Sequence, residues 1–318
     1  MPPDLLDRRL LFVTGKGGVG KTTVAAGLAS LAAARGKRTL VCEVDAKGNL
    51  ADFFETGPIG FDPRQIEPRL WAMSMQTEES LKEYLKLQLK VPLLAKIGPL
   101  ARTFDFVANA APGVKEILTV GKICWDLRES LQGRADWDLI VVDAAATGHV
   151  ISQLDAPRAI QELVAVGPIR NQTDWMVELL RDPTLTALNV VTSPEEMPVN
   201  ETIELVAAAR EQLDVPLGVV VVNRVLPEPF TRGDEEVFEA LHDPAALAVL
   251  REGAGAGVDQ VLDAARLAVS MRRSRAPHLA HLREQVDLPL LLLPYLFVRD
   301  HGLRVTRMVA DALGQELL

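Results

Sequence analysis

The sequence predicts an α/β fold, in which a mostly parallel, twisted sheet is flanked by helices. Three observations support this prediction. Short β-branched or leucine-rich runs alternate with longer helical patterns along the 318 residues, as in strand–helix–strand crossover units. A glycine-rich turn at residues 15–20 joins the first such run to the first helical pattern. Apolar residues make up 48% of the chain, which is too large a share for a disordered chain.

Six runs have the composition of strands that helices cover on both faces. Each is short and nearly continuous in apolar residues, whereas a strand with one face in water alternates apolar and polar residues. The predicted strands are Leu10–Thr14, Thr39–Val44, Leu139–Val142, Ala187–Thr192, Val219–Val222 and Leu290–Leu293, with Leu70–Met75 as a candidate seventh.

Helical patterns cover much of the remaining chain. Residues 77–132 are almost entirely helical in pattern. Because they separate the second strand from the strand that ends at Asp143, we expect a helical insertion subdomain on a single domain of residues 1–318. Three further helices are predicted at Thr22–Arg35, which Gly36 ends as a C-cap, at Val199–Leu213 and at Leu303–Leu317.

Charge and cysteine content exclude several classes of protein. With 34 Lys+Arg against 43 Asp+Glu, the formal net charge is −9, so the chain lacks the basic field of a nucleic-acid binder and we expect no stable binding to nucleic acids. Two cysteines, Cys42 and Cys124, are too few for a disulfide framework or a four-thiolate zinc site. The most apolar stretch, Leu288–Val298, is too short to span a bilayer, and the chain does not start like a signal peptide. We therefore expect a cytoplasmic protein without an integral membrane segment.

The glycine-rich turn contains the most specific motif of the sequence. It matches the pattern G-x-x-x-x-G-K-[ST] between a strand and a helix, which is the context that a phosphate-binding P-loop requires. Its backbone N–H groups can surround phosphate oxygens at a helix N-terminus, where Lys21 adds charge for the β- and γ-phosphates and Thr22 a hydroxyl for Mg²⁺. We therefore predict a P-loop NTPase fold. The residues predicted to bind the nucleotide are Gly15, Gly17, Gly18, Val19, Gly20, Lys21, Thr22 and Thr23.

Two acidic residues at strand ends complete the predicted site. Asp45 follows the second predicted strand, where a carboxylate can orient a water molecule against a γ-phosphate; its alternative role is to cap the next turn. Asp143 follows four apolar residues, as the Mg²⁺-binding carboxylate of a Walker B strand does. We expect Lys21, Asp45 and Asp143 to take part in phosphoryl transfer. The predicted metal ligands are Thr22, Asp45 and Asp143.

The string G-K-G-G-V-G-K-T-T at residues 15–23 resembles the deviant P-loop of the group that contains ParA, MinD, the nitrogenase iron protein and ArsA. In that group the first lysine, here Lys16, reaches across a dimer interface to the partner's nucleotide. The resemblance implies a nucleotide-sandwich homodimer, or a heterodimer with a paralogue, in which Lys16 stabilises charge on the transferred phosphoryl group. Without the resemblance, Lys16 is an ordinary exposed loop lysine.

Two further motifs resemble the ArsA family, which includes the arsenite-pump ATPase and the Get-type ATPase that targets tail-anchored membrane proteins. The first is D-x3-N-L-x-D-x-F at residues 45–54, and the second is D-x3-T-G-H at residues 143–149. The resemblance implies that Asp45 and Asp52 belong to switch I, with Asp45 positioning the attacking water. It also implies that switch II contains Asp143, Thr147, Gly148 and His149, and that the adenine of ATP is bound by Asn223 and Pro294.

The sequence departs from these relatives in its cysteines. The arsenite pump binds its metalloid with a thiol cluster, whereas here Cys42 lies inside a predicted strand and only Cys124 remains, so arsenite activation is not expected. The zinc-binding C-x-x-C of eukaryotic Get-type members is also missing from the sequence. A dimer of this chain would therefore be held together by nucleotide and packing.

These observations favour Mg²⁺-dependent ATP hydrolysis by a nucleotide-bridged dimer, with hydrolysis switching the helical subdomain for binding of a hydrophobic client protein or another partner. The alternative is a positioning ATPase like MinD or ParA, which acts on a membrane or nucleoid surface. Its membrane contact would come from an apolar stripe on the C-terminal helix, whose other interpretation is docking on the sheet. The residues of this stripe are Leu303, Val305, Val309, Leu313 and Leu317.

Overall fold

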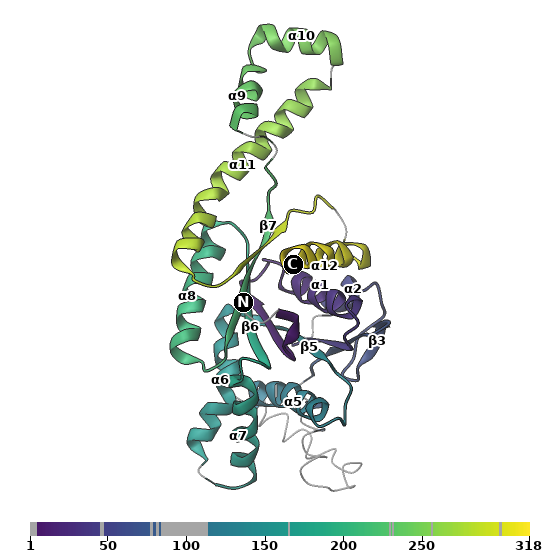
Figure 1. Cartoon of the computed structure of the whole chain (residues 1–318), viewed down its shortest axis with the longest axis vertical. Helices are drawn as coiled ribbons and strands as arrows, with labels where there is room; N and C mark the ends of the chain where they lie inside the picture. Colours follow the sequence, from purple (N-terminus) through teal and green to yellow (C-terminus); the bar gives the residue numbers. More distant parts are fainter. Residues whose placement is uncertain are drawn as a thin grey trace, which may run out of the picture.

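A sheet lies between two layers of helices in the computed structural model, and a helical arm projects from one end of it (Figure 1). The structure describes residues 5–44, 48–76, 79–80, 83, 114–164, 166–228, 230, 232–255, 257–298 and 301–318. Within these residues the sheet has eight strands in the order β3-β4-β2-β5-β1-β6-β7-β8. The strands are β1 (Leu10–Gly15), β2 (Thr39–Glu43), β3 (Arg64–Glu67), β4 (Leu70–Ser74), β5 (Leu139–Ala146), β6 (Thr186–Thr192), β7 (Leu217–Val225) and β8 (Leu290–Pro294).

The predicted parallel sheet is confirmed, with one addition at its edge. All neighbouring strands pair in parallel except β3, which is antiparallel to β4. The strand β3 was not predicted, because its sequence Arg-Gln-Ile-Glu is polar and only half-buried and so lacks the apolar run on which the prediction relied. Strands β5 and β7 are longer than predicted, since both continue beyond their apolar runs into the polar residues Asp143 and Asn223.

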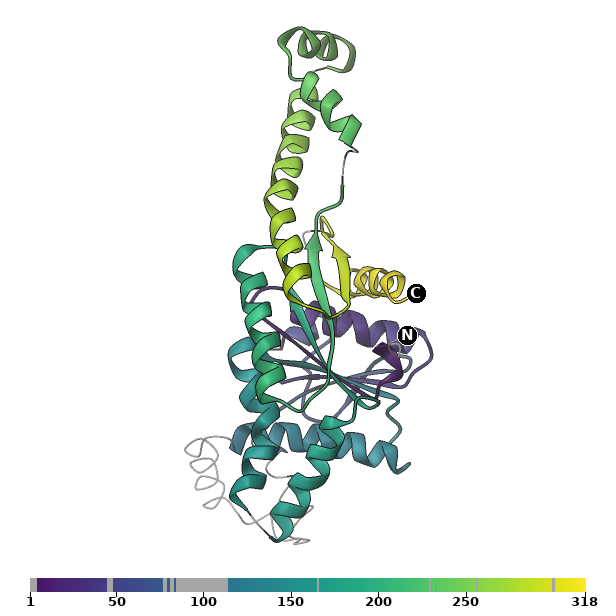
Figure 2. The ribbon, with the colours of Figure 1, turned by 60° about the vertical axis from the view of Figure 1, so that its left-hand side comes forward.

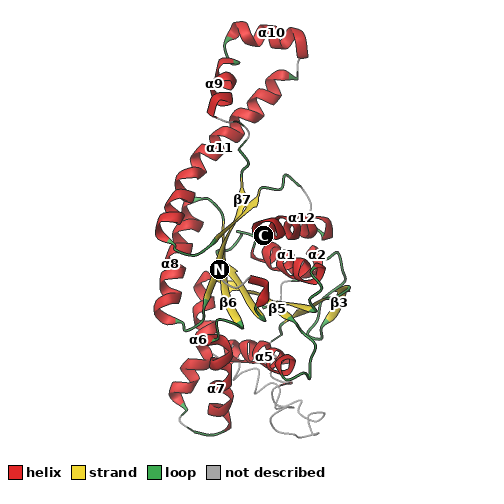
Figure 3. Ribbon diagram, viewed as in Figure 1, coloured by secondary structure: helices red, strands yellow, loops and turns green. Residues whose placement is uncertain are grey.

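Helices cover both faces of the sheet (Figure 3). One face carries α1, α2 and α12, and the other carries α5, α6, α7 and α8, while α9, α10 and α11 form the arm (Figures 1 and 2). Their bounds are α1 (Lys21–Ala34), α2 (Asn49–Phe53), α5 (Val114–Leu131), α6 (Thr147–Leu163), α7 (Pro168–Arg181), α8 (Glu196–Gln212), α9 (Arg232–Ala240), α10 (Pro244–Ala254), α11 (Val258–Gln285) and α12 (Leu303–Glu316), after a short 3₁₀ turn at Leu5–Asp7.

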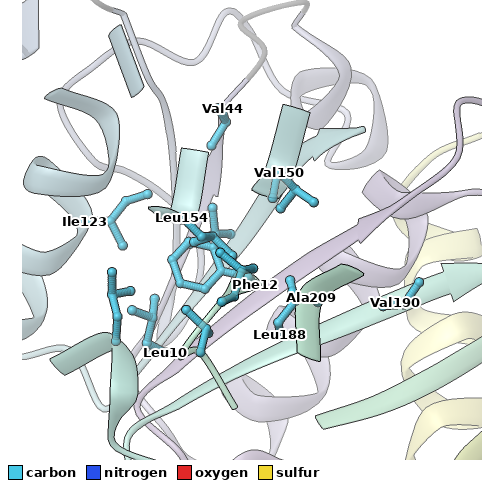
Figure 4. Close-up of a cluster of buried hydrophobic side chains, with 14 of the residues drawn as sticks. Leu10, Phe12, Val44, Ile123, Val150, Leu154, Leu188, Val190 and Ala209 are labelled. Carbon is cyan, nitrogen blue, oxygen red and sulfur yellow. The ribbon is translucent and has the colours of Figure 1, made fainter. Parts of the chain in front are cut away.

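Two hydrophobic cores follow from the alternation of side chains along the strands. In β1, Leu10 and Phe12 point into the core beneath α5 to α8, whereas Leu11 and Val13 point into the core beneath α1 and α12. This is the two-residue period of a strand, with both faces buried. Figure 4 shows the first of these cores, in which Phe12 is fully buried among residues of the sheet and of the covering helices.

The C-terminal helix α12 docks on α1 rather than projecting from the molecule. Of its predicted apolar stripe, Val305, Val309 and Leu313 are buried. The close approach depends on Gly27 in α1, because a Cβ atom there would lie 2.6 Å from Cγ1 of Val309. The prediction that this stripe docks within the protein is therefore confirmed, although its main partner is α1 and, of the sheet, β8 adds to the contact. The three buried residues have no exposed apolar face to offer a membrane.

The described part of the predicted insertion is mainly the helix α5. One face of α5 is buried on the sheet through Val120, Ile123, Cys124 and Leu127. Most of the preceding segment, at 77–78, 81–82 and 84–113, lies outside the described residues, so the insertion subdomain itself stays a prediction.

The arm between β7 and β8 was not predicted. It consists of α9, α10 and the 28-residue helix α11, whose lower end packs against α8 (Figure 2). At this end Leu282 is fully buried in the core, whereas α10 at the other end has no buried residue. Within the described part of the chain, none of the helices has both the length and the apolar composition of a transmembrane span.

A buried ionic cluster ties α5 to Glu83. Lys122 Nζ lies 2.9 Å from Asp126 Oδ1 and 3.0 Å from Glu83 Oε1, and the Lys122 and Asp126 side chains are only 13% and 14% exposed. Burial raises the pKa of the Asp126 carboxyl to about 6, although the Lys122 ammonium acts to lower it. The cluster therefore makes the stability of this region depend on pH.

Replacing Gly27 by alanine tests the packing of α12. Alanine is the better helix former by about 1 kcal/mol, but here its methyl group would collide with the stiff side chain of Val309, and overpacking typically costs about 1–3 kcal/mol. We expect Gly27→Ala to lower the free energy of unfolding in a denaturant titration. The matched control is Gly314→Ala in α12, where the nearest atom is the mobile end of Leu31 at 3.2 Å. An equal gain in stability in both variants would contradict the close packing.

Asp126→Asn tests the ionic cluster. The pKa of Asp126 is about 6 in the folded chain against the ordinary value of 3.8, so between these pH values the folded chain holds a proton that the unfolded chain has lost. Raising the pH through this window therefore lowers the stability of the wild type. We expect the free energy of unfolding of the wild type, relative to Asp126→Asn, to fall by about 1–3 kcal/mol between pH of about 4 and about 7. A difference that does not vary with pH would contradict this assignment.

Candidate functional site

The P-loop connects β1 to α1 at the carboxyl end of the central strands. Gly15, the last residue of β1, lies so close to β6 that a Cβ atom would be 2.1 Å from the carbonyl oxygen of Val191, and only glycine can occupy this position. The loop then passes through Gly17 and Gly18, which are both exposed, and α1 begins at Lys21. The loop is thus packed against the sheet at its base and open at its tip.

Asn223, two residues before the end of β7, holds the second half of the loop. Its Nδ2 donates a hydrogen bond to the carbonyl oxygen of Val19 at 2.9 Å, and a Cβ atom on Gly20 would lie 2.4 Å from Nδ2. The next residue, Arg224, adopts the left-handed conformation with φ of 61°, and its N–H donates to Asn223 Oδ1 at 2.9 Å. Both ends of the amide are therefore engaged, which fixes its orientation.

The two residues predicted to contact adenine lie on neighbouring strands. Pro294 ends β8 and pairs with Val225, whose carbonyl oxygen also accepts the N–H of Tyr295 at 2.8 Å. Asn223 is two residues before Val225, so both predicted adenine residues lie at the same edge of the sheet as the P-loop. Asn223 is buried, whereas Pro294 is exposed.

Thr22 and Asp143 meet beside the P-loop. Thr22 lies in the first turn of α1, and its Oγ1 donates to Asp143 Oδ2 at 2.6 Å. Asp143 lies on β5, the strand next to β1, and is 6% exposed. A hydroxyl and a carboxylate are oxygen ligands of the kind that Mg²⁺ prefers, so this pair fits the predicted metal site. Asp45, the third predicted ligand, lies outside the described residues.

Glu43 is a residue at this edge that sequence analysis missed. It ends β2, pairs in register with Asp143 on β5 and is 1% exposed. Its Oε1 accepts the N–H of Asn49 at 2.9 Å and so ties the end of β2 to the start of α2, across residues 45–47. A glutamate within a run of apolar strand residues was the signal that could have revealed it.

The predicted switch residues occupy the starts of two helices. Thr147, Gly148 and His149 form the first turn of α6, directly after β5, and the last two of them are exposed. Asp52 lies exposed in the short helix α2. The three residues predicted for switch II thus begin the helix that packs against α5, α7 and α8.

The two lysines of the P-loop make different contacts. Lys21 Nζ lies 3.4 Å from the carbonyl oxygen of Lys16 and so remains over the loop of its own chain. The ammonium group of Lys16 forms an ion pair with Glu201 of α8, and each of these side chains is 30% exposed. Thr23 follows in α1 and is half-buried.

The fold and this edge of the sheet define the class of the protein. A strand, a glycine-rich loop and a helix follow one another as in a P-loop nucleoside triphosphatase, and the threonine of the motif contacts an aspartate on the neighbouring strand. A sequence model of the anion-transporting ATPases matches residues 8–178 and 167–244. The chain belongs to this family, the ArsA family, and it is an ATPase.

Curated relatives agree with this family. ATPase BagA of Mycobacterium tuberculosis is 33% identical over 232 residues, which are 71% of this chain and 68% of the relative. A putative arsenical pump-driving ATPase of Halobacterium salinarum is 28% identical over 292 residues, and this chain spans 43% of its length. An ATPase ASNA1 homolog of Entamoeba dispar is 25% identical over 256 residues, covering 68% of this chain and 76% of the relative.

The two cysteines of this chain do not have the properties of a thiol-based metalloid site. Cys42 and Cys124 are free and buried in one core. Burial raises the pKa of the Cys124 thiol to about 12 and also raises the pKa of the Cys42 thiol, so both stay protonated near neutral pH, whereas soft metals bind the thiolate. Cys42 lies inside β2, as predicted, and packs in the core.

Asn223→Ala tests how far Asn223 shapes the P-loop. The variant leaves the carbonyl oxygen of Val19 without this hydrogen bond, and we expect the Kd for ATP to rise by about 5–10-fold. Inorganic tripolyphosphate has no adenine, so an equal weakening of its binding, measured by calorimetry, would report on the loop itself. Asn200→Ala, an exposed site in α8, is the control. If ATP binding weakens and tripolyphosphate binding does not, Asn223 contacts only the base.

Proposed function

We propose that this ATPase requires Mg²⁺ and works in the cytoplasm as a nucleotide-bridged dimer, either a homodimer or a heterodimer with a paralogue. The observation that supports this proposal is the position of Lys16. Lys16 precedes the exposed Gly17 and Gly18, and its side chain extends to Glu201 of α8 and is 30% exposed. Lys21, by contrast, remains over its own loop. A second chain facing this edge could therefore receive Lys16 while Lys21 serves the nucleotide of its own chain.

In the proposed mechanism each group has one task. The P-loop N–H groups and Lys21 bind the phosphates, and Asp45 orients the attacking water. Thr22 and Asp143 would hold Mg²⁺, which when bound neutralises charge on the β- and γ-phosphates. Lys16 of the second chain adds a cation where negative charge develops, as an arginine finger does.

We propose that hydrolysis is transmitted to the helical layer through α6. Switch II, at Thr147–His149, is the first turn of this helix, and α6 packs against α5 and α7. Helix α5 is the end of the predicted insertion at 77–132. A change at the γ-phosphate therefore has a short route to the segment that we propose binds a hydrophobic client or partner protein.

The alternative function, positioning on a membrane or nucleoid surface, has less support. Its membrane-binding version uses the C-terminal helix, but the apolar face of α12 is buried on α1. The net charge of −9 also opposes the electrostatic attraction to nucleic acid on which a nucleoid-binding version would depend.

Lys16→Ala tests the dimer. In the Asp45→Asn background, which we expect to bind ATP but barely hydrolyse it, light scattering should detect a dimer with Mg²⁺-ATP that Lys16→Ala abolishes. With Asp45 intact, Lys16→Ala should reduce turnover by roughly 10³-fold while ATP still binds. Arg283→Ala removes an exposed positive charge from α11 and is the control.

A peptide-binding measurement tests the proposed binding of a client protein. A fluorescent, leucine-rich helical peptide serves as the model client, and it should bind the ATP-bound Asp45→Asn dimer more tightly than the ADP-bound chain. A strict monomer with unchanged turnover in Lys16→Ala would refute the dimer. Peptide affinity that does not depend on the nucleotide would refute the switch.

A further inference from the structure

The ion pair between Lys16 and Glu201 joins two segments that are 185 residues apart in the chain. Lys16 belongs to the P-loop, and Glu201 to the second turn of α8 on the neighbouring layer. The two side chains are equally exposed, at 30%. Water can therefore reach the ion pair, and the pair can dissociate. While the pair is formed, the ammonium group of Lys16 stays on the chain to which it belongs.

Glu201 is carried by a firmly placed helix. The next residue, Thr202, is 1% exposed, and one turn further Leu205 and Val206 are buried in the core. At the start of α8, Glu195 forms an ion pair with Arg275 of α11 at 3.1 Å. The backbone that carries Glu201 is thus fixed by the core, and Lys16, beside the exposed tip of the P-loop, is the partner that can leave the pair.

We propose that Glu201 is a positioning residue for Lys16, which it holds on its own chain until a second chain presents a bound nucleotide. This inference rests on the proposed nucleotide-bridged dimer. On assembly, Lys16 exchanges one carboxylate for the phosphate oxygens of the nucleotide on the second chain. The exchange is favourable because the triphosphate carries more negative charge than Glu201, and because an interface excludes water that screens charge.

The ion pair also sets a threshold for assembly. Each chain must break its own pair before its lysine can bridge to the other chain, so the pair competes with dimer formation. An ion pair this exposed is weak, and its removal should change an equilibrium constant by about fivefold or less. The threshold is therefore small enough for Mg²⁺-ATP to overcome and large enough to measure.

Cross-linking tests the pair in the separate chain. A carbodiimide joins an amine to a carboxylate only when the two are in contact, and peptide mass spectrometry identifies the product. We expect a Lys16–Glu201 cross-link in nucleotide-free protein diluted until it is monomeric. The cross-link should be lost with a non-hydrolysable ATP analogue and Mg²⁺ at concentrations that give the dimer. Absence of the cross-link in the monomer would overturn the proposal, and so would its persistence in the dimer.

Glu201→Gln tests the threshold. A homodimer breaks two such pairs, so we expect the dissociation constant of the variant's dimer with the Mg²⁺-bound ATP analogue to be about 2- to 25-fold lower than that of the wild type. Turnover at low protein concentration should rise accordingly, and the gain should shrink as protein concentration increases. Glu204→Gln removes the same charge at an exposed position on α8 and should behave as the wild type does. Glu201→Asp, which keeps the carboxylate, should restore part of the threshold.

The measurements separate this inference from the proposed function. If the wild type forms no dimer with nucleotide, the proposed nucleotide-bridged dimer is refuted, and the proposed role of Glu201 is refuted with it. If the wild type dimerises and Glu201→Gln dimerises no more tightly than Glu204→Gln, only the role of Glu201 is wrong. A purely structural role would lower stability without changing the dependence of turnover on protein concentration.

Discussion

The nucleotide site depends on how closely the P-loop packs against the sheet. At Gly15 and Gly20 the loop lies so near to β6 and β7 that neither position has room for a Cβ atom. This packing requires β1 to lie in the middle of the sheet, with β5 on one side and β6 on the other. Two other strands then contribute a side chain at the same edge. These are Asp143 from β5 and Asn223 from β7. Parallel strands deliver these groups together because their carboxyl ends share one edge.

Sequence reasoning predicted the parts of the fold that are buried on both faces. Strands such as β1 and β6 are buried along their whole length and are rich in apolar residues, which makes them recognisable in a sequence. The edge strand β3 and the arm were missed for the same reason, because neither has a continuous apolar run or a fully buried face. Helix α10 is the clearest case, because it has no buried residue and so lacks the apolar stripe by which a helix is recognised in a sequence.

The residues of the candidate site also differ in whether the sequence could predict them. The P-loop and Asp143 were predicted because their residues are adjacent in sequence and form recognisable patterns. The contacts that Asn223, Glu43 and Glu201 make could not be predicted in this way. Those of Asn223 and Glu201 join segments that are 204 and 185 residues apart and become neighbours only when the sheet is assembled, so no local pattern encodes them. Glu43 bonds Asn49 only six residues further on, but no recognisable motif marked it. The resemblance to a family suggested Asn223, but its hydrogen bond to the loop came from the structure.

The base of the arm rests on the elements that hold the P-loop. Arg275 of α11 pairs with Glu195 at the start of α8 and lies 3.5 Å from the carbonyl oxygen of Arg224, the residue after Asn223. From Arg275 to Val258, α11 extends about 26 Å at about 1.5 Å per residue. A rotation of about 5° at the base would therefore move the far end by about 2 Å, by the geometry of a rigid helix. A small displacement where α11 meets the edge of the sheet that carries the P-loop would therefore be enlarged at the other end of the helix, next to α10, which has no buried residue.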